Sequence, residues 1–237
     1  MAKFALAKFT LFGSREAEHA ARADSVAVLG LGRFGTSVAV ELMKQGTDVL
    51  GVDNDREAVQ RLDGRLTYVV AADVTDQEVL TQLAIPEFER VVVGISRNIA
   101  ASILAASQLM RFGVREIWAA AASDQHGLIL EQIGVHHVLY PETDMGRRLA
   151  HQVRGSLLDY LQVDDTFAVA ETTPHAGLIG VPLDPAVVES VHGVMIIARR
   201  QAGGPWAFVG AGTVLRVRDT ILFAGPHAKT DAFSQLR

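Results

Sequence analysis

The sequence predicts an α/β protein in two parts, a doubly wound parallel sheet followed by a smaller α+β domain. Strand-like and helix-like runs alternate regularly over residues 25–139, which is typical of a parallel sheet. A glycine-rich turn joins the first strand-like run to the first helix-like run. Beyond residue 162 the runs become shorter and prolines separate them, so a second domain is expected there.

The first part of the chain contains the apolar runs expected of a buried sheet. The expected strands are residues 26–29, 48–52, 67–70, 90–95, 116–120 and 137–139. Strands that are apolar throughout are buried on both faces, so helices should cover both sides of the sheet. Those helices are expected at residues 36–45, 56–62, 77–83, 99–112 and 125–133. Glycine follows several of them, where a left-handed residue commonly ends a helix.

The second part begins with one more expected helix, over residues 142–158. Leu149, Val153 and Leu157 recur there on one helical face. Short strands are expected at residues 166–171, 194–198, 206–209 and 220–223, and helices at 185–191 and after Pro226. We therefore expect an N-terminal arm (1–23), a parallel-sheet domain (24–141), a crossover helix and linker (142–162) and a C-terminal domain (163–237).

The composition excludes several classes of protein. The chain has 237 residues and no cysteine, which excludes disulfides, thiolate metal sites and cysteine nucleophiles. Its formal net charge of -5 gives no electrostatic reason to expect nucleic acid as a partner. No apolar run approaches the roughly 20 residues that span a bilayer. The arm interleaves phenylalanine and leucine with Lys3 and Lys8, and it is either an extension docked on protein or a membrane or channel contact.

The glycine-rich turn is a phosphate-binding motif. Residues 26–29 lead into the sequence GLGRFG at residues 30–35, a G-x-G-x-x-G motif that opens a helix. Gly30 allows the tight turn, Gly32 lets phosphate approach the backbone, and Gly35 lets the helix pack near the strand. The helix amides and the positive end of the helix dipole then face the anion. The motif predicts an adenine nucleotide in a Rossmann-like domain, and the alternative is a turn that has lost its ligand.

Two acids follow at the ends of the next two strands. Asp53 lies where a carboxylate accepts hydrogen bonds from ribose hydroxyls, and its charge disfavours the 2′-phosphate of NADP. Asp53 can alternatively cap the helix that starts near Arg56, although Asp55 suits that position at least as well. Asp73 follows the third strand, where it can accept from the adenine amino group, while Thr75 or Asp76 can cap the next helix.

Arg33 and Asn98 each have two interpretations. The Arg33 guanidinium, inside the glycine turn, can bind a terminal phosphate through two hydrogen bonds or pair with a neighbouring carboxylate. Asn98 begins a helix, so it caps that helix, reaches the nucleotide, or does both. The complete set of candidate nucleotide contacts is Gly30, Gly32, Arg33, Phe34, Gly35, Asp53, Asn54, Asp73, Val74, Ser96 and Asn98.

The sequence does not indicate an enzyme. A dehydrogenase needs a substrate domain that holds a general acid or base near the nicotinamide. Residues 163–237 are short for that purpose, and they contain no recognisable catalytic triad or metal-binding motif. His136 and His137 belong to an expected strand, without a third ligand at a metal-binding spacing. A small NAD-dependent oxidoreductase and a nucleotide-free scaffold stay open as alternatives.

Together these motifs resemble the RCK family, the cytoplasmic, ring-forming regulators of Ktr- and Trk-type potassium uptake systems. The last matching segment, residues 140–146, carries the P-E-x-D-M-G sequence that is common in the family. The tail is similar to the family's C-terminal RCK_C domain. The other matching segments are residues 28–35, 52–53, 71–75, 98–102, 117–118 and 130–135.

The resemblance implies a function and further contacts. Members of the family are not enzymes; they form homodimers that assemble into an octameric ring, peripheral on the cytoplasmic face of a potassium-translocating membrane subunit. ATP or ADP binds the N-terminal domains, and NAD(H) also binds in Trk-like members. By this resemblance Arg33 contacts the terminal phosphates and Glu142 helps to hold a divalent cation, Mg²⁺ or Ca²⁺. The helix after Asp144 would carry the dimer contact.

One segment departs from the family pattern. Ktr-type members often have a lysine shortly after the Ile-Trp pair, close to the phosphates. Here Trp118 is followed by four alanines at residues 119–122. A triphosphate would be less completely neutralised without that cation, which leaves ADP and NAD(H) open beside ATP.

Overall fold

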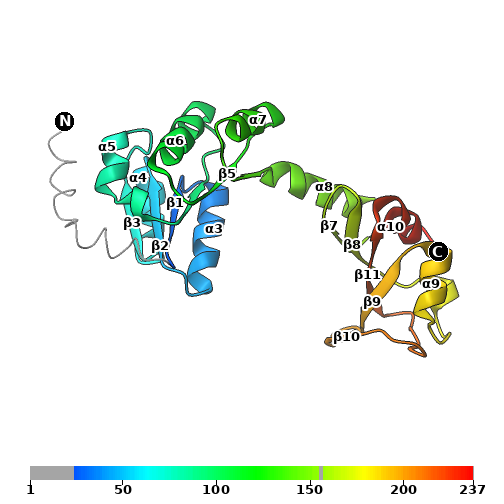
Figure 1. Ribbon diagram of the computed structural model, residues 1–237. Helices are drawn as coiled ribbons and strands as arrows, with labels where there is room; N and C mark the ends of the chain where they lie inside the picture. The colour runs from blue at the N-terminus through cyan, green and yellow to red at the C-terminus, as the bar shows by residue number, and fades with distance from the viewer. Residues whose placement is uncertain (1–23, 155–156, 237) are drawn as a thin grey trace. The chain divides into compact units, whose positions relative to one another are not determined.

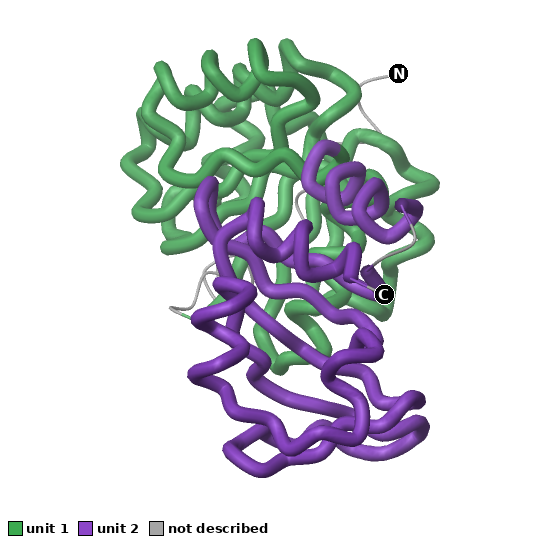
Figure 2. The backbone as a smooth tube through the Cα atoms, turned by 90° about the vertical axis from the view of Figure 1, so that its right-hand side faces the viewer, with its two compact units in different colours: residues 1–142 green, residues 143–237 purple. Residues whose placement is uncertain are grey.

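The computed structural model describes residues 24–154 and 157–236, so the expected N-terminal arm lies outside the described residues. The chain divides into two compact units, Met1–Glu142 and Thr143–Arg237, which Figure 2 distinguishes by colour. A parallel sheet in unit 1 and a separate antiparallel sheet in unit 2 confirm the predicted α/β class. Within the described residues, no helix has the length and apolar character needed to cross a membrane.

Unit 1 is built on a six-stranded parallel sheet, of which Figure 1 labels β1, β2, β3 and β5. The strand order is β3-β2-β1-β4-β5-β6. β1 is central, and its Val26 lies opposite Val49 of β2 on one side and Arg90 of β4 on the other. The strand order therefore reverses at β1, and sheets of this kind bind ligands at the carboxyl ends of the strands beside such a reversal. The strands are β1 (Val26–Leu29), β2 (Val49–Asp53), β3 (Tyr68–Ala71), β4 (Arg90–Val93), β5 (Glu116–Ala120) and β6 (His137–Leu139).

Helices cover both faces of this sheet, as the apolar strands predict. Val26 and Val28 of β1 pack with α3 and α4 in one core, and Ala27 and Leu29 pack with α5, α6 and α7 in the other. Alternate residues of one strand thus stabilise opposite layers, since successive side chains of a strand point to opposite faces. The helices are α3 (Arg33–Lys44), α4 (Arg56–Leu62), α5 (Gln77–Gln82), α6 (Ile99–Phe112) and α7 (Asp124–Gln132), with a 3₁₀ turn, η1 (Ile85–Glu87), before β4.

Unit 2 contains a five-stranded antiparallel sheet in the order β10-β9-β11-β8-β7. Its core includes Phe223 of β11, Val188 of α9 and Phe233 of α10. The elements of this unit are β7 (Asp159–Gln162), β8 (Phe167–Thr172), η2 (Ala176–Leu178), α9 (Pro185–His192), β9 (Met195–Arg200), β10 (Trp206–Phe208), β11 (Thr220–Pro226) and α10 (His227–Ser234).

The region expected to be a helix and linker, residues 142–162, differs from the prediction. α8 (Pro141–Val153) ends five residues earlier than residue 158, and residues 159–162 form β7 instead of a linker. Leu157 has helical spacing from Leu149 and Val153, but it is buried in the core of unit 2 while those two are exposed. Apolar periodicity alone could not separate a residue of the helix from one that packs under a sheet.

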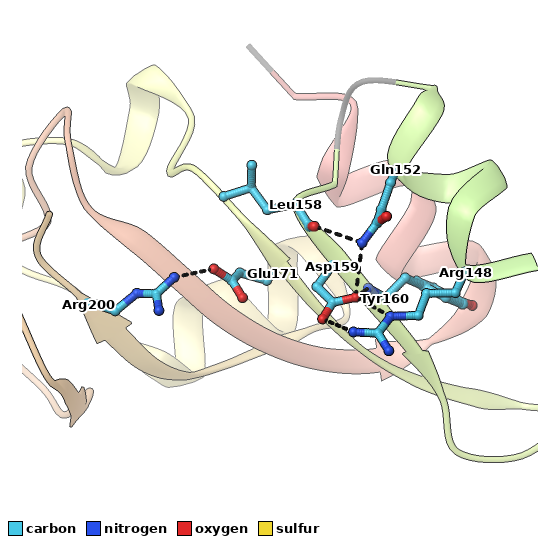
Figure 3. Close-up of polar contacts among 7 residues, drawn as sticks. All are labelled: Arg148, Gln152, Leu158, Asp159, Tyr160, Glu171 and Arg200. Carbon is cyan, nitrogen blue, oxygen red and sulfur yellow. Dashed lines mark hydrogen bonds and ion pairs between the residues drawn. The ribbon is translucent and has the colours of Figure 1, made fainter. Parts of the chain in front are cut away.

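Hydrogen bonds connect α8 to the start of β7 within unit 2 (Figure 3). The Arg148 guanidinium donates to both carboxylate oxygens of Asp159, over 2.6 Å and 2.5 Å. The Gln152 side chain donates to the Leu158 carbonyl oxygen over 3.0 Å, and to Asp159 as well. These contacts lower the pKa of Asp159, mainly through the hydrogen bond from Arg148. Another pair in Figure 3, Arg200 and Glu171, joins β9 to β8 over 2.8 Å.

Candidate nucleotide-binding site

The glycine turn lies between the carboxyl ends of β1 and β4. Gly30 has a φ of +93°, which favours glycine, and a Cβ atom on Gly35 would overlap the Gly30 carbonyl oxygen. A Cβ atom on Gly94, at the end of β4, would lie 2.8 Å from the same oxygen. By contrast, a Cβ atom on Gly32 would have no heavy atom within 4 Å. Gly30, Gly35 and Gly94 therefore allow close backbone packing, whereas Gly32 presents open backbone toward the outside.

Among the described helices that cover the sheet, α3 begins without a side chain that caps its first turn. Its N-cap residue, Gly32, has no side chain to accept a hydrogen bond, and its first turn contains no acid. Each of the other four described helices around this sheet has an N-cap side chain that accepts a hydrogen bond from a backbone amide of the first turn. Those caps are Asp55 for α4, Asp76 for α5, Asn98 for α6 and Ser123 for α7. The first amides of α3 and the positive end of its dipole are thus available to an anion.

Asp53 is held against the glycine turn by backbone amides. The Leu31 amide donates to Asp53 Oδ2 over 2.5 Å, and the Asp55 amide donates to Oδ1 over 2.8 Å. The cap of α4 is the Asp55 side chain, which accepts from the Glu57 amide over 2.9 Å. Asp53 is therefore not the helix cap, and its half-buried carboxylate keeps acceptor capacity for ribose hydroxyls.

Asp73 lies in a turn after β3. Its Oδ1 accepts from the Thr75 amide over 2.9 Å and from the Thr75 hydroxyl over 2.7 Å. Asp76 caps α5, so the exposed Asp73 is not needed for that purpose. The side chain of Val74 is buried in the core, so this residue can offer only backbone atoms to a ligand.

Arg33 and Glu142 meet although 109 positions separate them. Arg33 Nη2 lies 3.4 Å from Glu142 Oε1, and the two side chains are 87% and 81% exposed. Arg33 is the first residue of α3 and Glu142 the second residue of α8. An ion pair this exposed contributes little to stability, so both charges can be redirected to a ligand at small cost. The structure thus contains the carboxylate partner that was the alternative interpretation of Arg33.

The remaining predicted contacts are of three kinds. The Phe34 side chain packs against the core beside α3, which leaves its backbone for a ligand. Asn98 caps α6 by accepting from the Ala101 amide over 3.1 Å, in line with the capping interpretation. Asn54 is exposed and Ser96 is half-buried at the ends of β2 and β4. Among the described residues no three His, Asp or Glu side chains form a metal site, so a cation near Glu142 would take its further ligands from phosphate oxygens or water.

Sequence reasoning gave His126 no role, yet it lies buried in the first turn of α7, just beyond β5. Its Nδ1 accepts from the Ala122 amide over 3.1 Å, and burial lowers its pKa, so the ring is neutral near pH 7. The alanines that depart from the family pattern precede it, and Ala119, Ala120 and Ala121 are buried. Neither these alanines nor His126 therefore supplies a positive charge to the site. A histidine at a helix start carries no sequence signal of burial.

Comparison with known proteins identifies the family. The TrkA-N domain model matches residues 26–141. Ktr system potassium uptake protein C of Bacillus subtilis (strain 168) is 36% identical over 173 residues, which cover 73% of this chain and 78% of that protein. The chain belongs to the RCK family of Ktr-type potassium uptake regulators. This confirms the resemblance that the sequence motifs indicated.

Further relatives agree with the RCK assignment. Ktr system potassium uptake protein A of the same organism is 32% identical over 200 residues, covering 84% of this chain and 90% of that protein. The crystal structure of the GsuK RCK domain has a TM-score of 0.64 at 18% identity, and the GsuK channel bound to NAD has a TM-score of 0.65 at 18% identity. Both matches cover 91% of this chain, but only 48% and 39% of those chains. At this identity the two structures establish the shared fold.

Proposed function

We propose that this RCK subunit is a cytoplasmic, membrane-peripheral nucleotide sensor that gates a potassium-translocating membrane subunit of the Ktr or Trk type. The observation that carries the proposal is the meeting of Arg33 and Glu142 at the start of the uncapped helix α3. Open amides and a guanidinium suit the phosphates of ATP or ADP, and a free carboxylate suits the accompanying Mg²⁺ or Ca²⁺. Asp53 and Asp73 supply acceptors for ribose and adenine, and NAD(H) fits the same two acids.

The switch requires a ligand that distinguishes two conformations, because equal binding to both shifts nothing. The γ-phosphate of ATP provides such a difference if Arg33 reaches it in one conformation only. Moving Arg33 onto phosphate would release Glu142, which lies at the start of α8. A coupling of about 1–3 kcal/mol per site would be typical of allosteric proteins.

The exposed apolar side of α8 supports assembly into homodimers and then into an octameric ring. Met145, Leu149 and Val153 follow one another at intervals of four residues, and they are 58%, 54% and 76% exposed. None of the α8 side chains described is buried within this chain. A row of this kind is the pattern by which one helix packs against another. We therefore assign α8 to the dimer contact, through which a nucleotide-driven shift would reach the ring.

Binding measurements with the Arg33→Ala variant test the role of the guanidinium. Isothermal titration with ATP, ADP and NADH, each with Mg²⁺, gives the parent's preference. We expect the variant to keep adenosine binding through Asp53 while its ATP-over-ADP preference falls about fivefold or more. Arg61→Ala, which removes an exposed arginine from α4, is the matched control and should preserve the preference. An unchanged ATP-to-ADP ratio in Arg33→Ala would refute the proposed role.

A further inference from the structure

A side chain of α6 holds the turn that contains Asp73. Gln108 Nε2 donates to the Thr75 carbonyl oxygen over 2.5 Å, across 33 positions of sequence. Thr75 in turn donates its amide and its hydroxyl to Asp73 Oδ1. One continuous set of hydrogen bonds therefore runs from α6 through Thr75 to the carboxylate of Asp73.

The same amide leaves one of its own atoms unsatisfied. Gln108 Oε1 is buried and has no hydrogen-bond partner in the described part of the chain. A buried acceptor without a partner destabilises the folded state, and an apolar side chain of similar length would avoid that cost. Gln108 is half-buried beside Gln77, Arg111 and Phe112, while Ala105 and Leu109 on α6 are apolar and fully buried, so an apolar side chain has apolar neighbours on one side. The stability of the folded chain alone does not explain a glutamine at position 108. Its hydrogen bond to the Thr75 carbonyl oxygen does.

We propose that Gln108 is a positioning residue for adenine recognition, because it fixes the Thr75 turn and thereby the direction of the Asp73 carboxylate. The inference rests on the proposed nucleotide-sensing function and names the part of the site that selects the base. A carboxylate held in place accepts from the adenine amino group. It disfavours hypoxanthine, which presents a carbonyl oxygen at the corresponding position. Without the hydrogen bond from Gln108, the Thr75 turn would no longer fix Asp73, and the preference for adenine over hypoxanthine would be lost. The residues expected to bind the phosphates would be unaffected.

The test compares the full-length parent with Gln108→Met, which keeps the length of the side chain and removes both polar atoms. ADP and IDP affinities are measured by isothermal titration, and the melting temperature is measured without nucleotide. We expect the ADP-over-IDP ratio to fall by about tenfold. Removing the unpaired Oε1 and losing the bond to Thr75 have opposite effects on stability, so the melting temperature should stay close to that of the parent. A purely structural glutamine would instead lower the melting temperature and leave the ratio unchanged.

Ser102→Ala is the matched control. Ser102 Oγ is another buried α6 oxygen that has no hydrogen-bond partner among the described residues, the turn included. Its removal should raise the melting temperature and leave the ADP-over-IDP ratio as in the parent. Should Gln108→Met fail to fold, Gln108→Leu serves instead, because it also has no N–H to donate and introduces no buried charge.

The outcomes separate this inference from the function on which it rests. A parent protein that binds none of ATP, ADP and NADH would overturn the proposed function itself. A parent that binds ADP, with Gln108 variants that keep its ADP-over-IDP ratio, would overturn the role of Gln108 alone. A reduced ratio in the Gln108 variants together with an unchanged ratio in Ser102→Ala supports the inference.

Discussion

Charged residues are used differently in the two units. In unit 2, two ion pairs join different elements of the fold, Arg148 with Asp159 and Arg200 with Glu171. In unit 1, Asp53 and Asp73 at the strand ends accept from backbone amides, and the ion pair of Arg33 with Glu142 beside the glycine turn is almost fully exposed. Paired charges stabilise a fold and have little left for a ligand, whereas acids held by amides keep free acceptors. The contrast agrees with the proposal of nucleotide recognition in unit 1, and it gives the ion pairs of unit 2 a structural role.

The largest expected effect comes from Gly35→Ala in unit 1. Alanine is normally the better helix former, but its Cβ atom would overlap the Gly30 carbonyl oxygen. Because that oxygen belongs to the backbone of the buried turn, steric overlap should outweigh propensity, and we expect a loss of about 3 kcal/mol or more. Urea unfolding at pH 7 measures it. A stability equal to the parent's would show that the turn can rearrange around the new side chain. It would contradict the distinction between the tightly packed Gly35 and the open Gly32.

Gly32→Ala sharpens the comparison within the same turn. Gly32 has a φ of -65°, which alanine adopts readily, and its Cβ atom would meet no neighbour within 4 Å. We expect the stability without nucleotide to change by about 1 kcal/mol or less. At ADP concentrations near 100 times the parent Kd, the parent should gain about 2.7 kcal/mol, and the variant should lose most of that gain. Thermal shift with and without ADP measures both quantities, and an undiminished gain would argue against phosphate at Gly32.

The smallest expected effect is a pH dependence in unit 2. The pKa of Asp159 is lowered in the folded chain, chiefly by the hydrogen bond from Arg148, so its charged form favours folding. Its contribution is therefore fully present above the unfolded pKa of about 3.9 and is lost as the pH falls through the lower folded pKa. The Asp159→Asn variant should lack this part of the acid-induced loss of stability.

Urea unfolding from pH 6 to pH 2.5 compares the two proteins. Because the Asp159 side chain is 38% exposed, solvent screens the contribution and the difference should be small. The response to ADP at pH 7 should match that of the parent. Parallel stability profiles, or a changed ADP response, would contradict the structural role given to this pair.

Much of unit 1 was predictable because its signals are local. The apolar strands, the positive-φ glycines after the helices and the G-x-G-x-x-G turn each depend on a few consecutive residues. Asp53 was found for the same reason, since it ends a strand at the usual distance from the turn. In unit 2 the helix periodicity of residues 142–158 predicted a longer α8 than the structure has, since Leu157 packs beneath the sheet instead.

The sequence by itself determined the Rossmann-like sheet, the glycine-rich turn and the family, because these follow from short motifs and from periodicity along the chain. The tertiary structure decided that Arg33 meets Glu142, that Gln108 holds the Asp73 turn, and that residues 159–162 join a sheet. Each of these is a contact between residues distant in sequence or a choice between two partners. Such contacts depend on how whole elements pack, and no spacing within a single element encodes that packing.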